Sequence, residues 1–257
     1  MRIARFTTGD DPRFAILEEG SEELEVIAGD PLFTPIRRTG QRVPLEAARL
    51  LAPVIPRSKV IGVAHNYAAH ADEMGAQLAA EPELFLKPNT SVVGPGDPIV
   101  LPRWSDEVHH EAELAVVISR ICKDVPRERA GDVILGYTAA NDVTARDVQR
   151  RDDQWARAKG FDSACPLGPV VVTGLDSSDL AIRARVDGEV RQDGRTSQMI
   201  VDVAGLISFV SGVFSLLPGD VILTGTPAGV GPIEAGQRVE VEVEGIGILA
   251  NPVVAAD

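Results

Sequence analysis

The sequence predicts an α+β fold that is mainly β, with short strands in curved and mostly antiparallel sheets. Three observations support this class. Short apolar or alternating runs recur along the chain, Gly, Pro and Asp separate most of them, and few segments are long and unbroken enough for helices. Strands and helices do not alternate regularly, so a doubly wound parallel sheet is not expected.

The first 55 residues form a small β unit with turns. Strands are predicted at 2–6, 14–18 and 24–27, followed by a helix-like segment at 45–51. Pro53 and Pro56 then interrupt the pattern, as in a linker. We therefore expect a small N-terminal β domain at 1–55 and a larger domain at 56–257.

The larger domain begins with a predicted strand at 59–64. A helix follows, with Asn66 as its N-cap and no helix breaker between Tyr67 and Gly75. Further strands are predicted at 84–86, 98–101, 109–118, 134–140, 170–173, 182–186, 221–224 and 239–243, and further helices at 144–149 and 199–216. This order of elements agrees with a domain in which strands dominate.

Composition and charge exclude several classes of protein. The chain has 257 residues and a formal net charge of −13, without a stripe of Lys and Arg that would neutralise nucleic-acid phosphates. Its most apolar long stretch, 203–217, is shorter than the ~20 residues that span a bilayer. The two cysteines form no metal or redox motif, and the N-terminus lacks the apolar core of a signal peptide. We expect a cytoplasmic protein that binds neither nucleic acid nor membrane.

Two glutamates one residue apart, Glu111 and Glu113, interrupt the apolar strand predicted at 109–118. Side chains at i and i+2 of a strand share a face, with Cα atoms about 6.5–7 Å apart, so both carboxylates can reach one cation. Two buried like charges are unfavourable without such a cation, and oxygen ligands favour Mg²⁺, Mn²⁺ or Ca²⁺ over zinc. The alternative is a strand whose glutamates lie in water.

Asp142 is the best candidate for a third ligand, because it follows the apolar run 134–140. A carboxylate at the end of a strand is held rigidly and can face a cleft. The alternative is local: Asn141 or Asp142 caps the next helix, and Thr144 with Asp147 forms a variant of the capping box. The local sequence on its own favours the cap.

His70 and Glu73 lie at i and i+3 on a predicted helix, so they are neighbours on one helix face. A carboxylate that binds an imidazole fixes its tautomer and raises its basicity, which suits a general base near neutral pH. The alternative is an incidental pair on an exposed helix turn, and the pair taken alone favours that interpretation.

The glycine-rich segment 224–231 follows a predicted strand. It lacks the endings that define a P-loop or a dinucleotide fingerprint. Its exposed backbone N–H groups would suit a carboxylate, and an ordinary β-turn is the alternative.

Taken together, six segments resemble the fumarylacetoacetate hydrolase family in residue type and in order. They are 62–70, 85–91, 111–114, 141–149, 159–162 and 223–230. Each segment is weak evidence alone, but six in the same order are specific, and they cover the chain from about residue 59 onward. The resemblance implies a catalytic domain with a rolled, mixed β-sheet fold, in a protein that is usually a homodimer.

The resemblance also implies roles for individual residues. Glu111, Glu113 and Asp142 would bind Mg²⁺ or Mn²⁺, and segment 66–75 would be a lid over the substrate. The remaining implied site residues are His70 and Glu73 as a base dyad, Lys159 as a catalytic residue, and Gln149, Gly225 and Thr226 in substrate binding. Lys87 fits a structural role equally well. His65 departs from the family pattern, and its effect on substrate choice is left open.

The function implied by the resemblance is a metal-dependent enzyme that acts on a small 2-oxo acid through a metal-stabilised enolate. The leading reactions are C–C bond hydrolysis of the acylpyruvate or fumarylpyruvate type and decarboxylation of the oxaloacetate type. The alternative within the family is the 2-hydroxyhepta-2,4-diene-1,7-dioate isomerase or 5-oxopent-3-ene-1,2,5-tricarboxylate decarboxylase of aromatic catabolism. A catalytically silent binding or scaffold protein is the alternative from another class.

Overall fold

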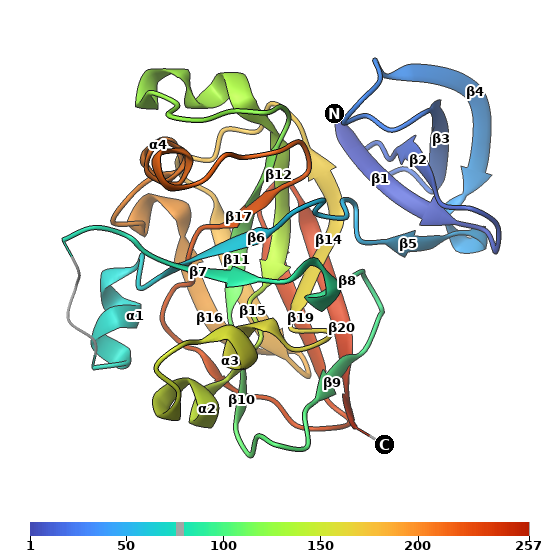
Figure 1. The fold of residues 1–257 in the computed structure, drawn as a ribbon. Coiled ribbons are helices and arrows are strands. Elements are labelled where there is room, and N and C mark those ends of the chain that lie inside the picture. Colours follow the sequence, from blue (N-terminus) through green and yellow to red (C-terminus); the bar gives the residue numbers. More distant parts are fainter. Residues whose placement is uncertain (76–79, 257) are drawn as a thin grey trace.

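The computed structural model describes residues 1–75 and 80–256, and it confirms an α+β fold that is mainly β (Figure 1). The strands are β1 (Arg2–Thr7), β2 (Arg13–Ile16), β3 (Glu23–Ala28), β4 (Arg37–Pro44), β5 (Arg49–Leu51), β6 (Val60–Ala64), β7 (Glu83–Lys87), β8 (Val92–Val93), β9 (Ile99–Leu101), β10 (Val108–His110), β11 (Ala112–Ile118), β12 (Ile134–Asn141), β13 (Thr144–Ala145), β14 (Cys165–Val172), β15 (Ala181–Val186), β16 (Glu189–Arg195), β17 (Val221–Leu223), β18 (Gly231–Pro232), β19 (Arg238–Val243) and β20 (Gly247–Ala255). The α-helices are α1 (Ala68–Glu73), α2 (Arg146–Arg151), α3 (Ala156–Gly160) and α4 (Val203–Val213), with 3₁₀ turns η1 (Leu45–Ala47), η2 (Asn89–Ser91), η3 (Arg127–Val133) and η4 (Thr196–Gln198).

Within the described residues, the strands form two large sheets and one small one. The largest has the order β4-β3-β2-β1-β14-β12-β11-β17-β6-β7, with β5 paired to β1 and β8 to β14. Most pairs are antiparallel, but β6 pairs with β17 in parallel, so the sheet is mixed. The second has the order β16-β15-β19-β20-β9, and β13, β10 and β18 form the third.

The N-terminal strands continue the largest sheet. Strand β1 pairs with β14, with Ile3 opposite Val171, and β2, β3 and β4 extend the sheet outward from there. Figure 1 shows these blue strands beside the rest of the molecule. The predicted boundary at residue 55 lies between β5 and β6, and the division into two domains stays a prediction.

Strand β11 is buried on both faces. Leu114 and Val116 belong to the same core cluster as Val241 of the second sheet, whereas Ala115 and Val117 belong to a cluster on the opposite face. Each large apolar side chain buried in this way stabilises the fold by about 1.5–3 kcal/mol. Side chains of β11 therefore alternate between two buried faces. The alternative of a strand with glutamates in water is wrong, because neither face of β11 meets solvent.

The strand predicted at 109–118 is interrupted at Glu111. Strand β10 lies in the small sheet and β11 in the largest one, with Glu111 between them. The Glu111 N–H donates to Asn141 Oδ1 at 2.9 Å, and the Asp142 N–H donates to the Glu111 carbonyl at 2.9 Å. These two bonds replace strand pairing, and they bring Glu111 next to Asp142.

The cap interpretation of Asp142 is wrong. Thr144 and Ala145 form strand β13, and helix α2 begins only afterward, without a side-chain cap. The Thr144 hydroxyl donates to the Asp142 carbonyl at 2.8 Å, while the Asp147 carboxylate accepts from Ser105. The Asp142 carboxylate is thus left for other partners.

Three further local predictions were wrong. Segment 45–51 is one 3₁₀ turn followed by β5, which pairs with β1. The helix predicted at 199–216 is shorter, because Asp202 caps α4 by accepting from the Gly205 N–H at 2.9 Å. Asn66 does not cap α1, since its side chain bonds instead to Thr224 and Val201.

No helix in the described ranges combines the length and hydropathy needed to cross a bilayer.

Candidate metal and substrate site

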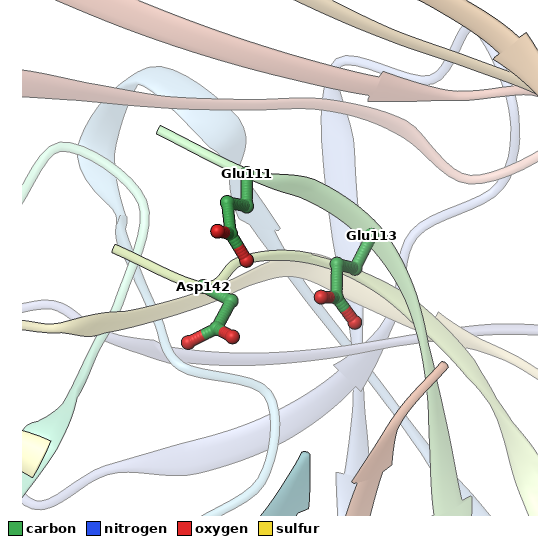
Figure 2. A group of neighbouring side chains, drawn as sticks. All are labelled: Glu111, Glu113 and Asp142. Atoms are coloured by element: carbon green, nitrogen blue, oxygen red, sulfur yellow. The ribbon is translucent and has the colours of Figure 1, made fainter. Parts of the chain in front are cut away.

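Three carboxylates meet where β11 and β12 run side by side. Ala112 pairs with Asn141, so Asp142, one residue beyond Asn141, comes next to Glu111 and Glu113. Each carboxyl group offers an oxygen within 4.8 Å of the others, and the three residues are 4%, 2% and 1% exposed for Glu111, Glu113 and Asp142. Figure 2 shows the three groups turned toward one common space. We call these residues the carboxylate triad.

Buried cations neutralise two members of the triad. The Lys159 ammonium donates to Glu111 at 2.9 Å and to Asp142 at 2.7 Å. Lys87 donates to the other oxygen of Asp142, and Arg146 donates to the other oxygen of Glu111. Burial by itself raises the pKa of Glu111, but Lys159 and Arg146 outweigh it and hold that pKa well below its ordinary value. Glu111 is therefore ionised.

Glu113 differs, because in the described part of the chain no Lys or Arg pairs with it. Its carboxylate accepts one hydrogen bond, from the Gly225 N–H at 2.7 Å. Burial, and then repulsion from Asp142 and Glu111, raises the pKa of Glu113 well above its ordinary value. A buried carboxylate without a counter-ion is costly, and a hard dication between three oxygens would remove that cost. The donor set thus fits Mg²⁺ or Mn²⁺.

The ring of Phe85 covers Lys159, with the ammonium 4.9 Å from the ring centroid. The ring can lie there because Gly62 has no side chain: a Cβ at this position would be 2.1 Å from Phe85 Cζ. This close packing gives a physical reason for the glycine in strand β6, since a larger residue would push Phe85 off the site.

His70 and Glu73 form a hydrogen-bonded pair on α1, with His70 Nδ1 3.2 Å from Glu73 Oε2. His70 is 4% exposed, so the alternative of an exposed helix turn is wrong. Glu73 also accepts from the Gly229 N–H at 3.1 Å, which ties α1 to the glycine-rich segment. Burial lowers the pKa of His70, although Glu111 and Glu73 oppose the shift. The imidazole is therefore neutral at pH 7.

One small pocket brings most of the predicted site residues together. Its lining includes, from that prediction, His70, Glu111, Glu113, Asp142, Gln149, Lys159 and Thr226, together with Val63, Ala64, His65, Phe85, Arg146 and Trp155. Glu73 and Gly225 lie behind this lining, each one hydrogen bond away from a lining residue. The geometry places the predicted residues in one site, and their catalytic and substrate-binding roles stay predictions.

Hydrogen bonds from other parts of the protein fix the glycine-rich segment in place. The Gly225 N–H is used by Glu113. The Thr226 hydroxyl donates to the Ala112 carbonyl at 2.8 Å and accepts from Gln192 Nε2 at 2.7 Å. Because a hydroxyl has one hydrogen, the Thr226 side chain keeps none for a substrate carboxylate in this arrangement.

Arg146 and Gln192 had no role in the prediction. Charge balance is the signal that would have found Arg146, since three buried carboxylates require buried cations. Its guanidinium also donates to Gln149 Oε1 at 2.6 Å, so it connects the triad with a predicted substrate contact. Gln192 lies on β16, a polar strand that the sequence did not predict, and no local signal pointed to it.

Comparisons with known proteins agree with this geometry. The family model for the fumarylacetoacetate (FAA) hydrolase C-terminal region matches residues 59–254, and an N-terminal model described as Rv2993c-like matches residues 1–53. A crystal structure of 5-carboxymethyl-2-hydroxymuconate delta-isomerase from Mycobacterium smegmatis is 52% identical, covers 100% of both chains and superposes with a TM-score of 0.93.

Two more relatives carry different names. Mitochondrial oxaloacetate tautomerase from Xenopus laevis is 38% identical over 99% of this chain and 90% of its own length. Fumarylpyruvate hydrolase from Pseudomonas aeruginosa, solved with Mn²⁺ and pyruvate, is 36% identical over 81% of this chain and 92% of that one, with a TM-score of 0.75. The matched family model spans most of the chain, and so this protein belongs to the fumarylacetoacetate hydrolase family.

Proposed function

We propose that this chain is a Mg²⁺- or Mn²⁺-dependent enzyme that moves a proton on a small 2-oxo acid. The leading reaction is keto–enol tautomerisation of an oxaloacetate-like diacid. The observation that carries the proposal is a buried imidazole, hydrogen-bonded to Glu73, in the same pocket as three convergent carboxylates. The similarity to oxaloacetate tautomerase supports the substrate class.

Glu111, Glu113 and Asp142 would hold the metal ion. When bound, a dication supplies Lewis-acid stabilisation of the negative charge that develops on the keto oxygen of a 2-oxo acid. Lys159 lies in contact with two of these carboxylates, so its ammonium adds positive charge at the same place.

His70 would move the proton. A carboxylate such as Glu73 only accepts hydrogen bonds, so Nδ1 of His70 carries the hydrogen and Nε2 is left as the base. That nitrogen can take a proton from the carbon next to the keto group and return one to the substrate oxygen or carbon. Glu73 stabilises the imidazolium that forms in between.

Cleavage of a carbon–carbon bond is the second candidate. The fumarylpyruvate hydrolase neighbour, solved with Mn²⁺ and pyruvate, supports it. In that reaction the same His70 would activate water, whereas decarboxylation would need little from it. Other neighbours are named as isomerases, and they support the isomerase reaction of aromatic catabolism as a further candidate. A silent scaffold has no physical need for a buried uncompensated carboxylate, which argues against that alternative.

The proposal includes a homodimer. Strand β7 lies at the edge of the largest sheet and carries Leu86, which is 47% exposed. An exposed apolar side chain on an edge strand suits pairing with a second copy. Sedimentation of the purified protein at micromolar concentration tests this part, and a monomer would refute it.

The test of the reaction is direct. The purified protein is mixed with Mg²⁺ or Mn²⁺ and freshly dissolved enol oxaloacetate, and the loss of enol absorbance is followed beside CO₂ release. Parallel reactions contain acetylpyruvate or fumarylpyruvate, with acyl-chain cleavage as the readout. Metal-dependent enol loss supports the tautomerase, metal-dependent cleavage supports the hydrolase, and no turnover of any of them contradicts the proposal.

A further inference from the structure

His65 holds an unusual backbone conformation in the pocket wall. It lies between β6 and α1 with φ of 53°, in the left-handed region that residues with a Cβ adopt rarely. Such a conformation persists where its surroundings enforce it, and it is frequent at functional sites. Here the next residue enforces it: the Asn66 side chain donates to Thr224 at 2.8 Å and accepts from the Val201 N–H at 2.9 Å.

The imidazole of His65 is fixed from three sides. Its Nδ1 lies 3.2 Å from Glu83 Oε2, since the pairing of β6 with β7 puts Ala64 opposite Glu83. The ring of Trp155 meets it edge-on at 6.2 Å, and the ring of His70 stacks on it at 6.3 Å between centroids. Because Glu83 only accepts, Nδ1 carries a hydrogen, and Nε2 is the nitrogen left for a ligand.

The cationic side chains of the pocket already have partners. Lys159 donates to Glu111 and Asp142, and Arg146 donates to Glu111 and Gln149. Within residues 1–75 and 80–256, no protein hydrogen bond engages His65 Nε2. His65 Nε2 therefore faces the pocket without a partner from the triad, and a carboxylate bound there would favour a second hydrogen on the ring, which Nε2 would donate to it.

His65 and His70 are neighbours in the pocket lining, so two successive atoms of a bound diacid can meet them. A 2-oxo acid with its first carboxylate and keto oxygen at the triad presents its third carbon to the base, His70. In this placement the next atom along the chain would lie near the neighbouring ring, His65, whose centroid is 6.3 Å from that of His70. In oxaloacetate that next atom is the carbon of the second carboxylate, whereas in an acylpyruvate it is a neutral ketone.

We propose that His65 is a specificity-determining residue that binds the distal carboxylate of a 2-oxo diacid through Nε2–H. This inference rests on the proposed function, because it places the first carboxylate and the keto oxygen at the triad. It assigns the selection between diacids and neutral acylpyruvates to one side chain outside the triad and the base dyad.

The test uses His65→Asn, because Asn tolerates the left-handed conformation and lacks the imidazole. KM and kcat are measured with Mn²⁺ for oxaloacetate and acetylpyruvate, and binding of oxalate is measured by calorimetry. Oxalate has no distal carboxylate, so it reports the triad alone. We expect KM for oxaloacetate to rise about tenfold or more, with KM for acetylpyruvate and Kd for oxalate changed by less than about twofold.

Two results would overturn the inference while oxalate binding is intact: an unchanged KM for oxaloacetate, or an equal rise in both KM values. If the wild-type protein does not bind oxalate, the proposed function itself is refuted. If the wild type binds oxalate but turns over neither substrate, oxaloacetate and 2-oxobutyrate are compared as competitors of oxalate. The inference then requires that His65→Asn weaken competition by oxaloacetate alone, and any other outcome rejects it.

Discussion

The carboxylate triad and the base dyad of His70 and Glu73 differ in how firmly the fold holds them. The triad lies at adjoining ends of β11 and β12, in the middle of the largest sheet, with its oxygens bonded to buried cations or to backbone. The dyad lies on a six-residue helix without a side-chain cap, and the side chain of Glu73 is 34% exposed. The part that would hold charge is rigid, and the part that would move protons rests on a few hydrogen bonds.

Replacing Glu113 with Gln tests the triad and has the largest expected effect. The variant should lose metal-dependent activity by about 10³-fold or more, because it removes one of the three proposed ligands of the metal ion. Wild-type protein should gain about 2.7 kcal/mol of stability with Mn²⁺ at 100 times its Kd, and the variant should gain none. Thermal unfolding with Mn²⁺ and with EDTA measures this difference.

Without metal, we expect the same variant to be more stable than the wild type above the ordinary carboxyl pKa. The pKa of Glu113 is raised in the folded protein, so the metal-free wild type loses stability as pH rises above the ordinary carboxyl pKa. Glu113→Gln removes that loss and keeps an oxygen for the Gly225 N–H. Glu189→Gln, at an exposed carboxylate, is the matched control and should behave as wild type. A metal-free Glu113→Gln protein that unfolds earlier than wild type at pH 8 would contradict this account.

Replacing His70 with Ala tests the dyad. We expect the tautomerase rate to fall about 10²- to 10⁴-fold, the usual contribution of a general base. Binding of Mn²⁺ should stay within about twofold of wild type, since His70 donates nothing to the triad's charge balance when neutral. Calorimetric titration of Mn²⁺ beside the activity assay separates the two effects. Equal losses of binding and rate would mean that the two regions are not independent.

The difference between the two regions also explains what the sequence could predict. Glu111 and Glu113 were identifiable as candidate metal ligands because they are charges in an apolar strand. Asp142 was identifiable as a third candidate because it follows the end of a predicted strand. The family resemblance then favoured a metal ligand over a helix cap at Asp142. The structure supplied the physical reason: the β11–β12 register pairs Ala112 with Asn141, which puts Asp142 next to Glu111.

Residues that act through tertiary contacts were not identifiable in this way. Arg146 looked like part of a helix start, and its burial depends on Glu111, which lies 35 residues away in sequence. Gln192 lies on an edge hairpin whose polar sequence gives no strand signal, yet it bonds to Thr226. Asn66 looked like an N-cap because capping residues and anchoring residues are the same types. Only the folded partners, Thr224 and Val201, distinguish the two uses.

The pH profile gives a more moderate effect. Burial lowers the pKa of His70 from 6.5, so the base should stay active below the pH at which an exposed histidine protonates. Activity should be level near neutral pH and rise through a midpoint below 6.5, falling about tenfold for each pH unit below that midpoint. Values of kcat/KM from pH 4.5 to 8 measure it. A midpoint above 7 would exclude a buried neutral His70 as the base.

Replacing Glu73 with Gln has the smallest expected effect on rate, but it shifts the acid midpoint of activity in a definite direction. Glu73 raises the pKa of His70 against the effect of burial, so its loss should move the acid midpoint to lower pH. A less basic imidazole is also a weaker base, and the plateau rate should fall by about tenfold or less. The Gln oxygen can still accept from the Gly229 N–H, so α1 keeps its attachment to the glycine-rich segment. A lower rate with an unmoved midpoint would show that Glu73 positions the helix without acting on the base, and the dyad would then reduce to His70 alone.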